Sequence, residues 1–410
     1  MKRITGIFVL TALAVFTAGC SRNADVEPSV APEDAWVHDI TLPVPIEFAP
    51  MGETTKGIVN GNEDLTTSSV FGMFAVAEGA EDLSADDGLN MRNKLCTYNP
   101  STQRLQFGYA AEDRLVYYPA NGNSFTFYAY HEKMSDDNVV FLTGDSEPLQ
   151  TVSESTSSSR QIMVAMTLAR PHDVLYAKAE APYFEQDGVE IPGFSSEYIR
   201  KSGNIPDFNF VHPAAAVRLR VVLDPESTKT ITRWDHLKLM HVTMTGHDTR
   251  NIATKANLCM VDLDNRANEG VFMDAVTKAS YKNWMTSNNS TGNLNFDVLA
   301  DADGDGAMDV CLEEPAMLTS EHFIMPMSEP LEITVTMRRQ RIDAKGNING
   351  NWLLAEETFV LDPSAFDPSL NGFEAGKMYN YKIIVKYTNA YPSDGTYHED
   401  SVELQVVEDV

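Results

Sequence analysis

Cysteine is scarce in this sequence, with only four among 410 residues, which excludes a fold held together mainly by disulfides. Cys20 lies near the N-terminus and leaves Cys96, Cys259 and Cys311 for the rest of the chain. Three thiols permit at most one disulfide, and Cys259 with Cys311 is the pair expected to share a domain. The alternative is that all three are buried thiols that pack as small apolar side chains.

Basic residues are also few, with 31 Lys and Arg against 59 Asp and Glu and a formal net charge of −28. A surface with this charge repels nucleic-acid phosphates and anionic lipid headgroups. We therefore expect no nucleic-acid partner. Any attachment to a membrane must come from something other than basic side chains.

The motifs of common enzyme classes are missing from the sequence. It has no Gly-x-Ser-x-Gly elbow, no His-Glu-x-x-His, no P-loop and no Gly-x-Gly-x-x-Gly turn. The nine histidines are scattered, and the spacing of His236, His241 and His247 does not match a usual metal pair. The sequence therefore predicts no enzyme activity, and surface or hydrogen-bonding roles for these histidines.

No apolar run is long enough for a permanent membrane span, but a short one lies near the N-terminus. Residues 7–16 are apolar, follow Lys2 and Arg3, and precede the small residues that lead to Cys20. About ten apolar residues cannot cross a bilayer of ~30 Å, and this layout is typical of a lipoprotein signal peptide. We expect removal of 1–19 and acylation of Cys20, with ordinary secretion as the alternative. The mature protein would be an outer-membrane lipoprotein with a flexible tether over 20–36.

Beyond the tether, the dominant hydrophobic period is two. Segments 217–223 and 331–338 alternate apolar and polar residues, and turn signals such as Asp187-Gly188 and Asn371-Gly372 separate short runs of this kind. Because successive strand side chains point to opposite faces, each run has one face in a core. We predict an all-β fold of two tandem antiparallel β-sandwich domains, over 37–203 and 204–410, without long helices.

One acidic segment matches the first part of a calcium loop. Gly306 stands at the sixth position of this segment, and oxygen ligands stand at the first, third, fifth and ninth: Asp301, Asp303, Asp305 and Asp309. The acid expected at position twelve is absent, because Leu312 stands there. The predictions are a weak calcium site or, alternatively, a solvated acidic turn. No other cofactor is expected.

Six groups of residues occur in a characteristic order along nearly the whole mature chain. They are 46–48 with 54–57, 70–74, 118–130, 173–177, 210–219 and 373–387. Together they resemble the fimbrillin family of two-domain lipoprotein pilins and pilus accessory proteins from Gram-negative gut and oral bacteria. The acidic segment at 301–309 is not part of that pattern. His212, within the tightest part of the resemblance, is expected to fix a bend by hydrogen bonding and not to bind a ligand.

The resemblance implies a fold and a mode of assembly. Its fold is two transthyretin-like β-sandwiches, and its polymerising members travel to the cell surface as lipoproteins. A trypsin-like protease then removes the N-terminal strand, and a strand of the next subunit takes its place by β-augmentation. The implied partners are other fimbrial subunits or further copies of this chain, the processing protease, and the outer membrane through the lipid anchor.

The N-terminal part of this exchange falls on a short alternating segment. Pro43 and Pro45 interrupt this segment and donate no hydrogen bond, so the strand they form is expected at an edge. The apolar positions expected on one face are Leu42, Val44, Ile46 and Phe48. Lys56, in a polar turn just after this segment, is the expected processing site; the alternative is an ordinary exposed lysine.

The C-terminal part falls on the predicted donor tail 388–410. Within it, Val402, Leu404 and Val406 alternate with polar residues. The alternative is that they form a last local strand or a frayed terminus. A second functional hypothesis is a surface lipoprotein that binds glycans or host ligands without polymerising, with exposed aromatic residues such as Trp284 or Trp352 as the contact surface.

Overall fold

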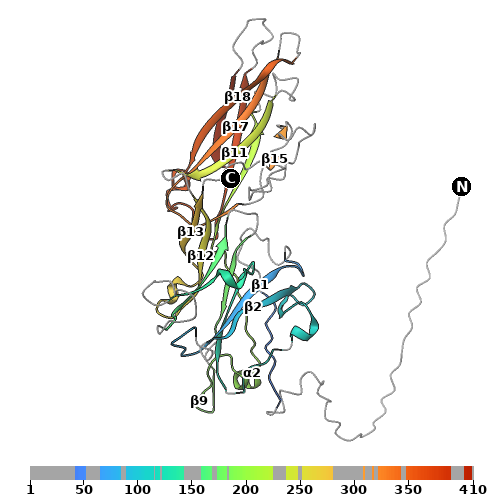
Figure 1. Ribbon diagram of the computed structural model, residues 1–410, viewed down its shortest axis with the longest axis vertical. Helices are drawn as coiled ribbons and strands as arrows, with labels where there is room; N and C mark the ends of the chain where they lie inside the picture. The colour runs from blue at the N-terminus through green and yellow to red at the C-terminus, as the bar shows by residue number, and fades with distance from the viewer. Residues whose placement is uncertain are drawn as a thin grey trace, which may run out of the picture. The chain divides into compact units, whose positions relative to one another are not determined.

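The structure is a computed structural model. It describes residues 42–51, 65–84, 89–114, 116–120, 122–142, 158–168, 173–181, 184–224, 237–247, 252–279, 308–309, 316–317, 322–342, 348–388 and 401–408. Several predicted features lie outside these residues: the signal peptide and tether, Cys20, Lys56, Trp284, Asp301, Asp303, Asp305 and Cys311. The regular structure of the described chain is mainly β-strands, with a few short helices, which confirms the predicted all-β class (Figure 1).

The first sheet has five antiparallel strands in the order β3-β2-β1-β4-β7. The strands are β1 (Val70–Ala77), β2 (Leu89–Asn99), β3 (Arg104–Phe107), β4 (Phe125–His131) and β7 (Leu175–Ala179). Every residue of β1 after Val70 is buried. This strand is central and covered on both faces, which explains why its sequence is a nearly continuous apolar run rather than an alternating one.

The second sheet has four antiparallel strands in the order β13-β12-β6-β5. They are β5 (Val139–Leu142), β6 (Gln161–Thr167), β12 (Ile252–Asp262) and β13 (Phe272–Ala279). In the register of β12 and β6, Leu258 lies opposite Val164. The division predicted between 37–203 and 204–410 therefore does not follow the sheets, because strands from both segments complete this one.

Two further sheets come from the C-terminal half of the chain. One has the order β15-β10-β19-β20 with β16 also paired to β10, and the other has the order β14-β11-β17-β18. Figure 1 shows β11, β17 and β18 side by side. The strands are β10 (Ala215–Leu223), β11 (Leu237–Gly246), β14 (Met308–Asp309), β15 (Ala316–Met317), β16 (His322–Ile324), β17 (Leu331–Ile342), β18 (Ile348–Leu361), β19 (Met378–Thr388) and β20 (Ser401–Glu408).

One pair in these sheets departs from the predicted antiparallel arrangement. β10 and β19 run parallel, with Val217 opposite Tyr379 and Val221 opposite Ile383. Parallel neighbours need a long crossover connection and cannot be joined by a tight hairpin. Here the two strands are separated along the chain by all of 224–377, which includes the second sheet's β12 and β13.

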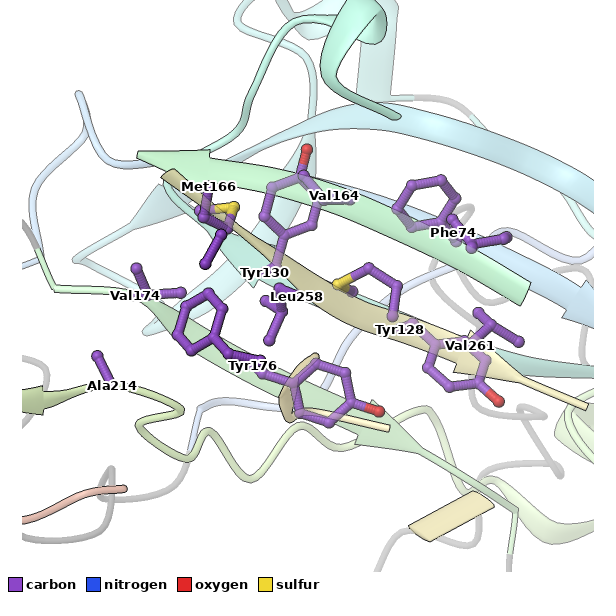
Figure 2. Packing of buried hydrophobic residues seen from close by; sticks show 14 of the residues in the cluster. Phe74, Tyr128, Tyr130, Val164, Met166, Val174, Tyr176, Ala214, Leu258 and Val261 are labelled. Carbon is purple, nitrogen blue, oxygen red and sulfur yellow. The ribbon is translucent and has the colours of Figure 1, made fainter. Parts of the chain in front are cut away.

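Two clusters of buried apolar residues stand out among the described residues. One lies among strands of the first two sheets and brings Phe74, Tyr128 and Tyr130 together with Val164 and Leu258 (Figure 2). The other contains the alternating positions of β10 and β17 together with residues of β19, all nearly free of solvent contact: Val217, Leu219, Leu331, Ile333, Val335, Met337, Ile383 and Val385. Apolar burial of this kind is the main favourable term in the folding of such a sheet protein.

Turn and cap residues explain two short local elements. β8 (Glu185–Gln186) and β9 (Val189–Glu190) form a hairpin whose central residues, Asp187 and Gly188, both have positive φ values of 55° and 76°. This matches a type I′ turn and confirms the turn predicted there. The helix α2 (Ser196–Ser202) begins after Ser195, whose side chain accepts a hydrogen bond from the Tyr198 N–H, and ends at Gly203 in the left-handed region.

Among the described residues, the remaining helical elements are single turns: η3 (Ala111–Arg114), η4 (Asp136–Asn138), η5 (Arg266–Asn268) and α4 (Pro363–Phe366). None of the helices that the structure describes has the length and apolar character needed to cross a membrane.

Candidate functional site

The N-terminal segment predicted for strand exchange is tightly packed through its side chains. Val44, Ile46 and Phe48 are 1%, 3% and 2% exposed, which is the alternation that the sequence predicts. Leu42 does not share this face, because it is 39% exposed. The buried positions of the alternation are therefore Val44, Ile46 and Phe48.

The backbone hydrogen bonds of Val44 and Ile46 both join this segment to 116–118. The Val44 carbonyl accepts a hydrogen bond from the Tyr118 N–H at 2.9 Å, and the Ile46 N–H donates to the Val116 carbonyl at 2.7 Å. Pro45 lies opposite Tyr117 between these bonds, as an isolated bridge and not within a strand. Pro43 and Pro45 lack an N–H, so neither can donate a hydrogen bond to a neighbouring strand.

Aromatic rings hold the end of this segment. The ring of Phe48 lies 5.3 Å from that of Phe107, 5.4 Å from that of Phe208 and 5.9 Å from that of Phe127, measured between centroids. Beyond Phe48, the Ala49 N–H donates to the Pro206 carbonyl at 2.8 Å. The segment is therefore held mainly by apolar side chains in a pocket that distant parts of the chain build.

The C-terminal tail forms a local strand in this structure. β20 pairs antiparallel with β19, so that Val402, Leu404 and Val406 lie opposite Tyr387, Val385 and Ile383. The strand is the last in the order β15-β10-β19-β20 and has one neighbour among the described strands. In this isolated chain the tail therefore forms a last local strand, which was the alternative interpretation. The role of the tail as a donor strand stays a prediction.

His212 has the hydrogen-bonding role expected of it. Its Nδ1 atom lies 2.5 Å from Oδ2 of Asp173, and the two side chains are 2% and 4% exposed. Close to this pair, Tyr176 and Val211 exchange two backbone hydrogen bonds, of 3.0 and 2.8 Å. The pair thus holds the chain just before β10 against the start of β7. The two residues come from segments 173–177 and 210–219, which are distant in sequence.

The structure gives little information on the predicted calcium ligands. Asp309 is the last residue of β14 and lies opposite Lys238 of β11, while the other three predicted ligands are not among the described residues. Within the part of the chain that the structure describes, no three His, Cys, Asp or Glu side chains are grouped to hold a metal ion. His247 pairs instead with Glu332, Nδ1 to Oε1, at 2.6 Å.

Two of the cysteines are free, buried thiols. Cys96 and Cys259 are both completely inaccessible and form no disulfide. Burial is the main cause that raises the pKa of Cys259 to about 12. At neutral pH this thiol is therefore protonated and unreactive, in line with a packing role.

A buried charge network around Glu269 was not predicted from the sequence. The Glu269 side chain is 3% exposed; its Oε2 lies 2.7 Å from the Lys178 ammonium and its Oε1 2.8 Å from the Arg266 guanidinium. The Tyr128 hydroxyl also donates to Oε1, at 3.2 Å. Burial, and after it the charge of Glu269, raise the pKa of Tyr128. No local pattern marks this site, because Tyr128 and Lys178 come from strands far away in the sequence.

Comparison with known proteins gives structural similarities at low sequence identity. No family model and no curated protein matches the sequence. A candidate cell adhesion protein from Bacteroides uniformis is 15% identical, with a TM-score of 0.39 over 89% of this chain and 98% of that one. A candidate adhesin from Bacteroides thetaiotaomicron is 11% identical, with a TM-score of 0.37 over 90% and 99% of the two chains.

A fimbrial protein from Bacteroides ovatus is also similar, at 13% identity and a TM-score of 0.28. The match covers 87% of this chain and 54% of that longer one. Adhesion and fimbrial proteins are thus among the structures that this chain resembles. Identities and TM-scores of this size carry no functional argument, so the proposed function rests on the residues of the chain itself.

Proposed function

We propose that this protein is a structural or accessory subunit of cell-surface fimbriae, exported as a lipoprotein and assembled by β-strand insertion. The observation that carries the proposal is the binding of the segment around Val44–Phe48. Its side chains are buried, while its described backbone pairing is a few separate hydrogen bonds and isolated bridges and no continuous strand ladder. This is the arrangement expected of a segment that a similar one can replace.

Energetics favour side-chain pockets as the basis of the exchange. Burying one large apolar side chain contributes roughly 1.5–3 kcal/mol, whereas a backbone hydrogen bond contributes about 1 kcal/mol net. Val44, Ile46 and Phe48 therefore supply most of the affinity of the segment for its site. An incoming strand with apolar residues at alternate positions would fill the same pockets and pair with the backbone of Val116 and Tyr118.

The tail β20 is the proposed donor. It has the required alternation and lies at the end of its sheet. In an isolated subunit it pairs with its own β19, so donation requires it to leave that edge. The proposed order of events is therefore cleavage after Lys56, loss of the N-terminal segment with its lipid anchor, and insertion of β20 from a neighbouring subunit.

N-terminal sequencing of surface-extracted protein tests the cleavage. The expected mature chain starts at Gly57, and Lys56→Ala should leave Cys20 attached and prevent polymerisation. Lys201→Ala, which changes an exposed lysine of α2, is the matched control and should assemble normally. Filaments that still carry Cys20 would contradict the processing step and indicate an anchor or tip role.

Deletion of residues 401–410 tests the donor. We expect monomers that keep the β-sheet signal in circular dichroism and form no polymers. Polymers of normal length from the deleted chain would rule out β20 as the donor.

A further inference from the structure

A cavity of about 520 Å³ lies where the ends of several strands meet. Its lining includes Ile252 and Ala253 of β12, residues of β13, and the segment that follows β16. The volume is within the range of pockets that bind small organic molecules. None of the predicted exchange residues lines it, so its role is separate from strand insertion.

The inner walls of the cavity are apolar. Ile252 and Ile324 are 3% and 1% exposed, and Met325, Pro326 and Met327 are half-buried along one side. Thioether side chains adapt their shape and polarise easily, so such a wall accepts varied apolar groups. An occupant would bury an apolar body here.

The mouth of the cavity is negatively charged. Asp274 and Glu329 are both exposed at its lining, and no Lys or Arg side chain lines it among the described residues. Within the same part of the chain, neither carboxylate forms an ion pair or a side-chain hydrogen bond. A third lining residue, His247, is held at 2.6 Å from Glu332, so that pair brings no uncompensated positive charge. The charge of the mouth is thus available to a cation.

We propose that this cavity binds small amphipathic amines, with the apolar body against the isoleucine and methionine walls and the ammonium group between Asp274 and Glu329. Each part of the ligand corresponds to one part of the site: apolar contact provides affinity and the two carboxylates provide selection for positive charge. A neutral ligand of the same shape keeps only the first contribution, and an anion is repelled.

Three compounds with one common body test the proposal: 4-phenylbutylamine, 4-phenylbutanol and 4-phenylbutyrate. Binding to the full-length protein is measured by ligand-observed NMR titration at fixed ionic strength. We expect the amine to bind about tenfold more tightly than the alcohol, as two nearby surface charges allow, and the acid to bind most weakly. Equal affinity for amine and alcohol would overturn the proposal.

The formal charge of −28 attracts any cation, so a matched control is needed. Asp274→Asn with Glu329→Gln should abolish the preference for the amine. Asp137→Asn with Glu112→Gln makes the same change of charge at exposed positions outside the cavity and should keep the preference. An equal loss of preference in both double variants would show general attraction only and refute the site.

A filled cavity provides the second test. Ala275→Phe places a ring in the lining and should weaken binding of the amine and the alcohol alike by at least about tenfold. A thermal melt shows whether this variant is folded. If it is not, the comparison of the two double variants described above still tests the proposal. Unchanged binding to the folded variant would place the ligand elsewhere and overturn the proposal.

Discussion

Nδ1 of His212 lies 2.5 Å from Oδ2 of Asp173, and both side chains are almost completely buried. Asp173 lies two residues before β7 and His212 three residues before β10, so the contact joins parts of the chain that are distant in sequence. A buried polar group is costly unless it is paired, so each of the two residues depends on the other.

His212→Ala should therefore lower the free energy of unfolding by about 3 kcal/mol, since it leaves the Asp173 carboxylate buried without its ring partner. Urea denaturation gives this value. His247→Ala removes a ring from the exposed pair with Glu332 and should cost much less. Equal losses in the two variants would mean that burial does not set the strength of the first pair.

Gly72→Ala should destabilise the first sheet. A Cβ atom at Gly72 would lie 2.2 Å from a ring carbon of Tyr130 and 2.6 Å from Oδ1 of Asn93. Tyr130 and Asn93 share a hydrogen bond of 2.7 Å, so neither side chain can move without losing it. We expect a loss of about 2 kcal/mol or more in chemical denaturation.

The control for this change is Gly79→Ala, where nothing lies within 4 Å of the new Cβ and only the positive φ opposes it. It should cost about 1 kcal/mol. A Gly72 variant as stable as the Gly79 variant would show that the Tyr130 ring can rearrange freely.

Glu269→Gln should weaken the contacts between strands of the first two sheets. The change removes the negative charge of the buried carboxylate, which lies 2.7 Å from the Lys178 ammonium and 2.8 Å from the Arg266 guanidinium. We expect a loss of about 3 kcal/mol in the free energy of unfolding. Glu197→Gln affects only an exposed pair with Lys201 in α2 and should leave the melting temperature nearly unchanged.

Burial lowers the pKa of His322 from 6.5 to about 3. Between these two values the unfolded chain binds more protons at this residue than the folded chain does. The free energy of unfolding should therefore fall as the pH is lowered from about 6.5 towards 3, by up to about 1.4 kcal/mol per pH unit from this group. His322→Gln, which cannot titrate, should give a flatter dependence over that window.

Denaturation curves at a series of pH values measure this effect. A slope that is the same with and without His322 would show that this ring does not contribute to acid destabilisation.

The elements that sequence predicts correctly are those that depend on neighbouring residues. Leu331, Ile333, Val335 and Met337 are all buried, as their alternation predicts, because the strand period is a local property. The turn at Asp187-Gly188 follows for the same reason. Helix α2 was missed, although Ser195 and Gly203 are the cap residues that mark such a helix.

The features that sequence reasoning missed depend on partners far along the chain. Nothing within Ile252–Asp262 indicates that it pairs with β6, and a boundary placed at residue 203 follows from composition and turn signals alone. The same limit applies to Glu269, whose partners Tyr128 and Lys178 lie on β4 and β7. For the exchange segment, the buried face of Val44 to Phe48 was predicted, while the exposure of Leu42 was not.

The pairing of β12 with β6 also determines when the second sheet can be completed during synthesis. During synthesis, β5 and β6 emerge long before their neighbour, and the exposed edge of β6 stays open until Asp262 has left the ribosome. The N-terminal half therefore cannot complete its core alone, and the nascent chain remains incompletely folded for most of its elongation. A late-closing sheet of this kind keeps this part of the polypeptide in a threadable state until well over half of the chain has been made.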